Sequence, residues 1–239
     1  MRYLSSRCLA AAAVLACCIG PSPAQSVSGV KPELSVLLIS DEDGLAQMAL
    51  QNSDPEPYLV QTVVYTVDGD KDLVVKPTPV VSRIEAGGRQ IVRFALTKPA
   101  KPLVVQHYQR VTFEGIPATA PKDGRSRVRV NVRYDYPIII SPANLPPLDA
   151  PWTLLEWRMN AGQLEIYNSS RYVVRMSEEV DLLPAQVRVK LLQRSFVLPG
   201  ERLSVALPAA ATVGLTTVRV YPATLFGFAA PTYDAKLNP

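Results

Sequence analysis

The sequence predicts an all-β protein built from two sandwich domains. Between Lys31 and Leu237 the apolar segments are short, rich in Val, Leu, Ile, Thr and Tyr, and separated by Pro, Gly, Asn and Asp. No helical periodicity persists beyond about two turns, and turn residues recur about every 8 to 12 positions. Short strands at that spacing favour β-sandwiches over any helical or mixed fold.

The first residues predict a secretory signal peptide over residues 1–24. Arg2 and Arg7 precede an apolar run from Leu9 to Ile19, and small residues follow up to Ala24. This run is too short to span a bilayer, and no later stretch reaches the roughly 20 apolar residues that a transmembrane helix needs. A lipoprotein signal with Cys17 as the lipidated residue is the alternative.

The mature chain divides into a first domain over residues 25–142, a linker over 143–151 and a second domain over 152–239. The linker is rich in proline, which indicates a semi-rigid connection. Expected strands of the first domain are Leu34–Ile39, Leu45–Gln51, Tyr58–Val67, Leu73–Lys76, Arg83–Glu85, Gln90–Ala95, Gln106–Glu114 and Arg125–Pro142. Expected strands of the second are Leu154–Met159, Gln163–Tyr167, Tyr172–Ser177, Val187–Leu192, Arg202–Ala206 and Thr216–Tyr221. The spacing suits immunoglobulin-like sandwiches.

The segment Arg125–Pro142 has the clearest strand pattern in the chain. Apolar and polar residues alternate with the period of two that a half-buried strand requires. Pro137, which has no N–H to donate, suits an edge or a strand end. One interpretation is a solvated amphipathic strand; the other is an edge that pairs with an extended segment of a partner. The apolar positions are Val128, Val130 and Val132, and the basic ones Arg127, Arg129 and Arg133.

The composition argues against several classes of chemistry. All three cysteines lie within residues 1–24, and His107 is the only histidine, so thiol-based and multi-histidine metal sites are not expected. The run SDEDG at residues 40–44 lacks the spacing of a calcium loop. The formal charge is only +4, and Arg2 and Arg7 contribute two of these charges, so no nucleic acid partner is expected. Neither a cofactor nor a catalytic residue is predicted, and Trp152 and Trp157 are expected in the core.

Four motifs, in order, resemble the periplasmic chaperones of the chaperone–usher pilus pathway, the PapD-like family. They are NSDPEPYLVQ at 52–61, PTPVVSRIEAGGRQIVRFAL at 77–96, VTFEGIP at 111–117 and VRYDYPIIISP at 132–142. The last is more similar to the archaic branch, which serves spore-coat-like subunits. The resemblance extends over nearly the whole first domain and is weaker in the second.

The resemblance implies two immunoglobulin-like domains set as an L and a periplasmic location. It also implies donor-strand complementation, in which Val128, Val130, Val132 and the neighbouring Arg127 and Arg129 complete the sandwich of a pilus or coat-like subunit. Either face of the strand can be the donating one. Arg133 is the expected anchor for the subunit's terminal carboxylate. The position that the P-pilus type would use as second anchor is Val36 here. Lys31 is expected instead, because Val30-Lys31-Pro32 is similar to the Ile-Arg-Pro that archaic members have near the mature N-terminus.

The implied partners are the subunit and an outer-membrane usher, and a self-capping homodimer stays open. Two alternatives remain. The first is a secreted structural or adhesive fibre subunit, or another immunoglobulin-like binding module. The second, which agrees less well with the sequence, is a hydrolase that uses His107.

Overall fold

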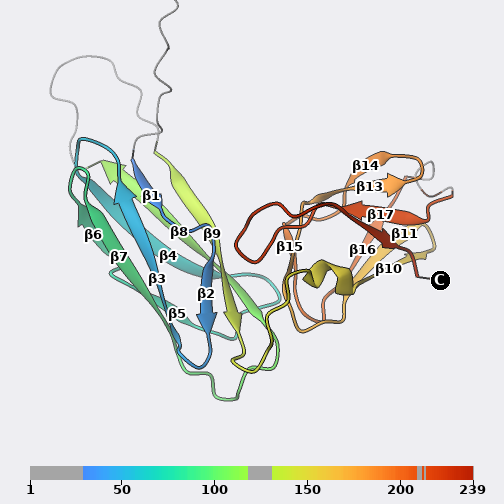
Figure 1. The fold of residues 1–239 in the computed structure, drawn as a ribbon, viewed down its shortest axis with the longest axis horizontal. Helices are drawn as coiled ribbons and strands as arrows, with labels where there is room; N and C mark the ends of the chain where they lie inside the picture. The colour runs from blue at the N-terminus through green and yellow to red at the C-terminus, as the bar shows by residue number, and fades with distance from the viewer. Residues whose placement is uncertain (1–28, 118–130, 209–211, 213, 239) are drawn as a thin grey trace, which may run out of the picture.

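The protein consists of two β-sandwich domains set at an angle to each other (Figure 1). The structure is a computed structural model, and it describes residues 29–117, 131–208, 212 and 214–238. The expected signal peptide and four of the five expected donor residues lie outside these residues. Within them no helix is long and apolar enough to cross a membrane.

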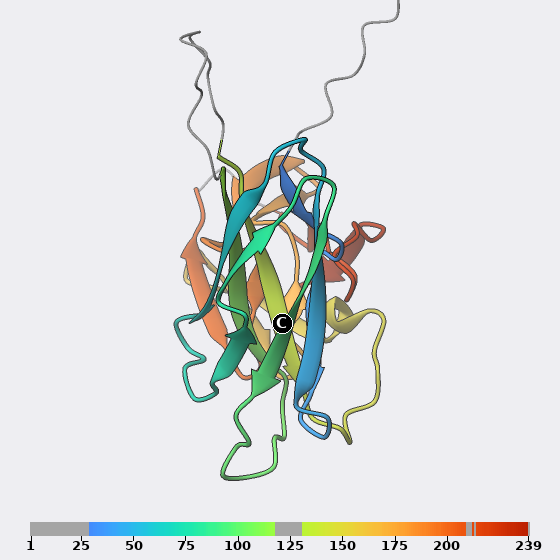
Figure 2. The same cartoon turned by 90° about the vertical axis from the view of Figure 1, so that its left-hand side faces the viewer.

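The first domain has two facing sheets; in Figure 2 this domain lies in front of the second one, and its strands run up and down the view. One has the strand order β1-β3-β7-β5, and the other has the order β2-β9-β8-β4-β6. All neighbours are antiparallel except β2 and β9, which are parallel. The strands are β1 (Val30–Pro32), β2 (Leu37–Ser40), β3 (Leu45–Asn52), β4 (Tyr58–Thr66), β5 (Val75–Thr78), β6 (Val81–Ile84), β7 (Arg89–Leu96), β8 (His107–Pro117) and β9 (Arg133–Ser141).

The second domain begins at a short 3₁₀ helix, η1 (Pro151–Leu154). Its sheets have the orders β10-β11-β16, β12-β15 and β14-β13-β17-β18. The strands are β10 (Leu155–Asn160), β11 (Gln163–Asn168), β12 (Val174–Arg175), β13 (Glu179–Leu183), β14 (Val187–Lys190), β15 (Phe196–Val197), β16 (Arg202–Ala206), β17 (Thr217–Val220) and β18 (Tyr233–Lys236).

Sequence alternation explains how the strands fill each core. In β7, Val92, Phe94 and Leu96 are buried while the residues between them are exposed. Successive side chains of a strand point to opposite faces, so one face of β7 packs inward and the other meets solvent. In the second domain Trp157 is 1% exposed, which confirms the expected core position, and Trp152 is also buried.

A buried asparagine closes the same kind of corner in each domain. Asn52, at the end of β3, donates from Nδ2 to the carbonyl oxygens of Glu56, Ile84 and Glu85 at 2.9–3.2 Å. Asn168, at the end of β11, uses its Nδ2 in the same way at two carbonyl oxygens. Neither side chain has any exposed surface. Because buried carbonyl groups need donors, each asparagine ties a loop to its sandwich.

We expect Asn52→Ala to lower the free energy of unfolding by about 2 kcal/mol, because carbonyl oxygens would lose their donor in a buried place. Urea denaturation followed by circular dichroism measures the change. Asn160→Ala, at an exposed residue, is the control and is expected to change stability by less than about 0.5 kcal/mol. Equal effects of the two substitutions would contradict the corner role of Asn52.

Asp181 on β13 makes stability depend on acid pH. Hydrogen bonds from Arg188 and Tyr221 lower the pKa of Asp181 from 3.8 to about 2. The stabilisation from the charged carboxylate is therefore complete above the unfolded pKa of about 3.9 and is lost as pH falls through about 2.

Accordingly, Asp181→Asn should be less stable than the unmodified protein at pH 6, and the difference should shrink as pH falls from about 4 to about 2. Urea unfolding at a series of pH values measures it. Asp149→Asn, at an exposed residue for which no ion pair with a described residue is found, should show no such trend. A pH-independent difference for Asp181→Asn would refute the prediction.

Most expected strands are present, but several limits differ. The expected strand Leu34–Ile39 is present as β2, which begins at Leu37, and the separate strand β1 before it, which pairs in the other sheet, was not expected. The expected strand Tyr172–Ser177 keeps only the two residues of β12. Strands β13, β15 and β18 were not expected. Gly69 and Gly87 have positive φ angles in tight turns, and the Thr78–Pro79 bond is cis.

Candidate functional site at the free edge of β9 and the domain junction

Strand β9 has one free edge near the angle between the domains (Figure 1). One side of β9 pairs with β8 along nearly its whole length. On its other side β2 pairs only from Ile138 onward. Among the described residues, no strand pairs with the segment Arg133–Pro137 on that side. An edge of this kind presents unpaired backbone groups that can accept an added strand.

The two faces of β9 have different surroundings. Tyr134 and Tyr136 pack on the core of the first domain, with their rings stacked at 5.9 Å between centroids. Arg133 and Asp135 are exposed on the opposite face, and further along that face Ile139 packs against the second domain. The outer face of β9 is therefore the face that looks toward the second domain.

The structure describes one of the five expected donor residues, Val132. Arg127, Val128, Arg129 and Val130 lie outside the described residues. Val132 is half-buried, and it lies two residues before Tyr134 and four before Tyr136, the two core tyrosines of β9. Every second residue of a strand points to the same face. By this spacing of two, the valine positions of the donor segment follow the same sequence alternation as the inward-facing residues of β9.

The two expected anchors lie on different sheets. Arg133 begins β9 opposite Glu114 and is exposed, and no described residue forms an ion pair or hydrogen bond with its side chain. Lys31 is exposed on β1, opposite Gln51, in the other sheet. Both point outward, and the outer faces of a sandwich point in opposite directions. The structure does not bring Arg133 and Lys31 together.

An apolar cluster joins the two domains at the base of the angle between them. The ring of Tyr108 on β8 stacks on Phe196 of β15, with centroids 4.0 Å apart, and the guanidinium of Arg194 lies 4.5 Å from the Phe196 centroid. Val36 is 5% exposed within this cluster, so this position supplies packing and no charge. The cluster contains Val36, Tyr108, Ile139, Val173, Phe196 and Leu198.

Hydrogen bonds between the two domains also stabilise the junction that contains this apolar cluster. The backbone N–H of Gln106 donates to the carbonyl oxygen of Arg171 at 2.8 Å, and the N–H of Val173 donates to Oε1 of Gln106 at 2.9 Å. Nε2 of Gln106 donates to Oγ of Ser141 at 3.0 Å. One buried glutamine therefore connects the start of β8, the end of β9 and the second domain.

A charged network that the sequence did not reveal lies on the outer face of β8 and β9. Nε of Arg110 donates to Oδ1 of Asp135 at 2.9 Å, and the hydroxyl of Tyr65 donates to Oδ2 at 2.6 Å. Nη1 of Arg110 also donates to the hydroxyl of Tyr108 at 3.1 Å. Burial lowers the pKa of Arg110, but the hydrogen bonds to Asp135 and Tyr65 and the charge interactions with Tyr108 and Asp135 together outweigh this effect, and the net shift is upward. Arg110 therefore stays charged beside the junction.

His107 has a structural setting at the start of β8. Its Nδ1 lies 2.8 Å from Oδ1 of Asp70, and the backbone N–H of Tyr108 donates to Oδ2 of Asp70 at 2.6 Å. The ring is partly exposed. Within the described residues no serine hydroxyl hydrogen-bonds to His107, and no cluster of metal-ligating side chains is found.

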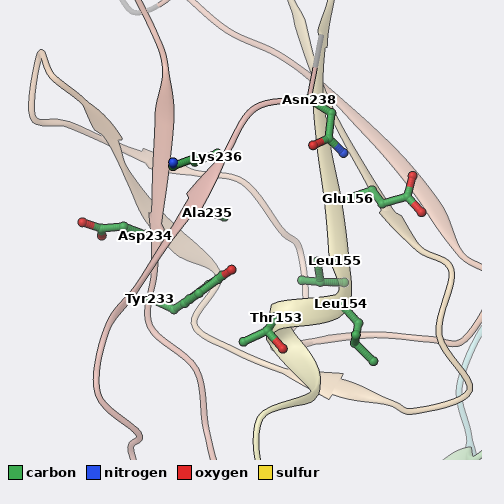
Figure 3. Close-up of a pocket in the computed structure, with 9 residues that line it drawn as sticks. All are labelled: Thr153, Leu154, Leu155, Glu156, Tyr233, Asp234, Ala235, Lys236 and Asn238. Atoms are coloured by element: carbon green, nitrogen blue, oxygen red, sulfur yellow. The ribbon is translucent and has the colours of Figure 1, made fainter.

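A hollow of about 370 Å³ lies in the second domain, away from the junction (Figure 3). It lies between β10 and β18. Its acidic side chains Glu156 and Asp234 point to opposite sides, and Asp234 forms an ion pair with Arg219 at 2.7 Å. This hollow brings no set of catalytic groups together.

The chain was compared with known proteins. Residues 29–146 match the model of the pili and flagellar-assembly chaperone PapD N-terminal domain. The uncharacterized fimbrial chaperone YhcA of Escherichia coli K12 is 39% identical over 213 residues, covering 88% of this chain and 92% of YhcA.

Solved structures have the same fold. The Salmonella enterica SafA pilin in complex with the SafB chaperone matches with a TM-score of 0.71 at 17% identity, covering 90% of this chain and 99% of that one. The Pseudomonas aeruginosa CupB2 chaperone matches with a TM-score of 0.67 at 18% identity, covering 87% and 100%. The match to the PapD N-terminal domain and the 39% identity to YhcA show that the chain belongs to the PapD-like family of fimbrial chaperones.

Proposed function

We propose that this protein is a periplasmic chaperone that captures pilus or coat-like subunits by donating a strand to them and delivers them to an outer-membrane usher. The free edge of β9 over Arg133–Pro137 is the observation that carries the proposal. Two further findings support it: the family of the chain, and a SafA pilin–SafB chaperone complex of similar fold.

In this proposal the apolar positions Val128, Val130 and Val132 fill the groove of an incomplete subunit. The alternation of the segment suits this role, because a strand that adds to a sheet presents every second side chain to one face. Arg127 and Arg129 flank the groove. Arg133 remains the proposed carboxylate contact on the face toward the second domain, and Lys31 is a separate candidate on the other sheet.

Co-purification tests the function. Tagged mature protein is expressed in the periplasm together with the small exported proteins encoded beside its gene. We expect a one-to-one complex with at least one of them, weakened by Arg133→Ala and unaffected by Arg93→Ala, which removes an exposed arginine from the outer face of β7. Lys31→Ala is measured separately. Failure of every neighbour to form a complex would refute the chaperone proposal.

Export is part of the proposal and has its own test. Mass spectrometry of the protein purified from the periplasm should find Gln25 as the first residue, because cleavage is expected after Ala24. A lipid-modified Cys17 at the N-terminus would instead establish the lipoprotein alternative. The free edge of β9 also suits a self-capping homodimer, which analytical ultracentrifugation of the protein without subunit would detect.

A further inference from the structure

The hollow of the second domain lies between two strand edges that are paired at a single point. Strands β10 and β18 run in the same direction and meet at one bridge, Arg158 to Asn238, where the N–H of Asn238 donates to the carbonyl oxygen of Trp157 at 2.7 Å. Toward their N-terminal ends the two strands separate, and the hollow of about 370 Å³ lies between them (Figure 3). Among the described residues, no strand fills this space.

Backbone groups on both edges point toward the hollow. The N–H of Leu237 bonds to the residue just before β17, and the N–H of Asn238 bonds to β10. Because the hydrogen-bonding groups of successive residues point to opposite sides of a strand, those of Asp234 and Lys236 point toward β10, as Asn238 does. By the same alternation the carbonyl group of Leu155 points toward β18, because it lies two residues before the carbonyl that Asn238 uses. Free edges of this kind can accept an added strand.

The first domain shows what fits in the corresponding place. The two domains are built alike, because β1 pairs with β3 as β10 pairs with β11, and the same asparagine corner closes both. In the first domain β2 then runs parallel to the last strand, β9, and its residues Leu37 and Ile39 are buried in the core. In the second domain no described strand takes the place of β2, and the edge of the last strand, β18, stays open toward the hollow.

The side chains around the hollow suit a strand in which apolar and polar residues alternate. Leu155 and Tyr233 pack on the core of the second domain, and Tyr233 points toward β10 (Figure 3). The next residue of β10, Glu156, points away from the hollow on the outer side, and Lys236 of β18 is exposed. A strand between these edges would therefore have one face against apolar side chains and the other in solvent.

We propose that the hollow binds an extended segment of another polypeptide, which adds to β18 as a parallel strand in the way that β2 adds to β9. The backbone of the segment pairs with the free edge over Tyr233–Lys236, and its apolar residues, at every second position, face Leu155 and the core. Main-chain hydrogen bonds supply the affinity and the alternate side chains supply the selectivity. The site belongs to the second domain alone, so it does not depend on the strand donation proposed for the first.

Fluorescence anisotropy with the full mature protein measures binding. The probe is a fluorescein-labelled Thr-Leu-Thr-Ile-Thr peptide with a C-terminal amide, so that no terminal carboxylate takes part. The comparison peptide is Thr-Pro-Thr-Pro-Thr with the same label and amide, because proline has no N–H to donate to a neighbouring strand. We expect the first peptide to bind at least about ten-fold more tightly than the second, since the second loses main-chain hydrogen bonds.

Hydrogen exchange of backbone amides, followed by NMR on the unmodified mature protein, locates the bound peptide. The N–H groups of Asp234 and Lys236 should exchange rapidly in the free protein, and at least about ten-fold more slowly when the Thr-Leu-Thr-Ile-Thr peptide saturates it. Equal binding of the two peptides, no binding of either, or protection confined to β9 would overturn the inference.

Two substitutions at one position test the backbone contact. Lys236→Pro removes an N–H that faces the hollow and that β17 does not use, and edge strands tolerate proline at such positions. It should weaken binding of the Thr-Leu-Thr-Ile-Thr peptide at least about five-fold, whereas Lys236→Thr, which keeps the N–H, should change it less than about two-fold. Equal affinities of two variants with the same melting temperature would contradict the proposal. If Lys236→Pro melts lower, the exchange measurement on the unmodified protein decides.

Discussion

Val130→Asp is expected to abolish recovery of the chaperone–subunit complex, with a loss of affinity of at least about 100-fold. A carboxylate at that position would have to enter an apolar groove without a partner, and burial of an unpaired charge costs several kcal/mol. The measurement is the ratio of subunit to tagged chaperone after co-purification from the periplasm.

Arg129→Asp is the matched control, since it introduces the same residue at the neighbouring position of opposite parity. It should weaken the complex much less than Val130→Asp. A larger effect of Arg129→Asp would show that the arginine face of the segment donates, and equal tolerance of both would rule out donation by this strand.

Phe196→Ala is expected to cost about 3–5 kcal/mol of stability, because it removes a buried aromatic ring. Phe196 is 3% exposed and fills the space between Tyr108 and the side chain of Arg194. The cavity would lie at the contact between the domains, so the angle between them should also vary more. Urea denaturation measures the first effect, and small-angle X-ray scattering measures the second as a broader distribution of interatomic distances.

Phe228→Ala provides the comparison within the same domain. Its ring is 70% exposed, so its loss should change stability by less than about 0.5 kcal/mol. Similar scattering curves for Phe196→Ala and the unmodified protein would show that the hydrogen bonds of Gln106 are enough to hold the domains in place.

The sequence predicted the fold best where alternation is long. The limits of β3, β4 and β7 agree with the expected ones to within one residue, because eight or nine residues of alternation leave little choice of register. Strand β18 was missed because Ala235 is its only buried residue. Strand β15 has two residues, and its place is fixed by contacts with β12 and Tyr108 that local sequence does not encode.

The candidate site was predicted only in part. Alternation singled out the segment that contains β9, and parity indicated which side chains share a face. The sequence pattern could not show that Arg110 and Asp135 pair across β8 and β9. Nor could it show that Arg175 of the other domain lies near Arg110. Those neighbours depend on strand register and on the domain contact, and both are tertiary features.

The parallel pairing of β2 with β9 has a consequence for biosynthesis. Leu37–Ser40 lies beside Ile138–Ser141, about 100 residues later in the chain. Because the N-terminus is synthesised first, the first sandwich cannot be completed until nearly all of that domain has been synthesised. Contacts of such long sequence separation slow folding. Slow closure would suit the export proposed above, because a polypeptide that stays unfolded for longer can still pass through a narrow channel.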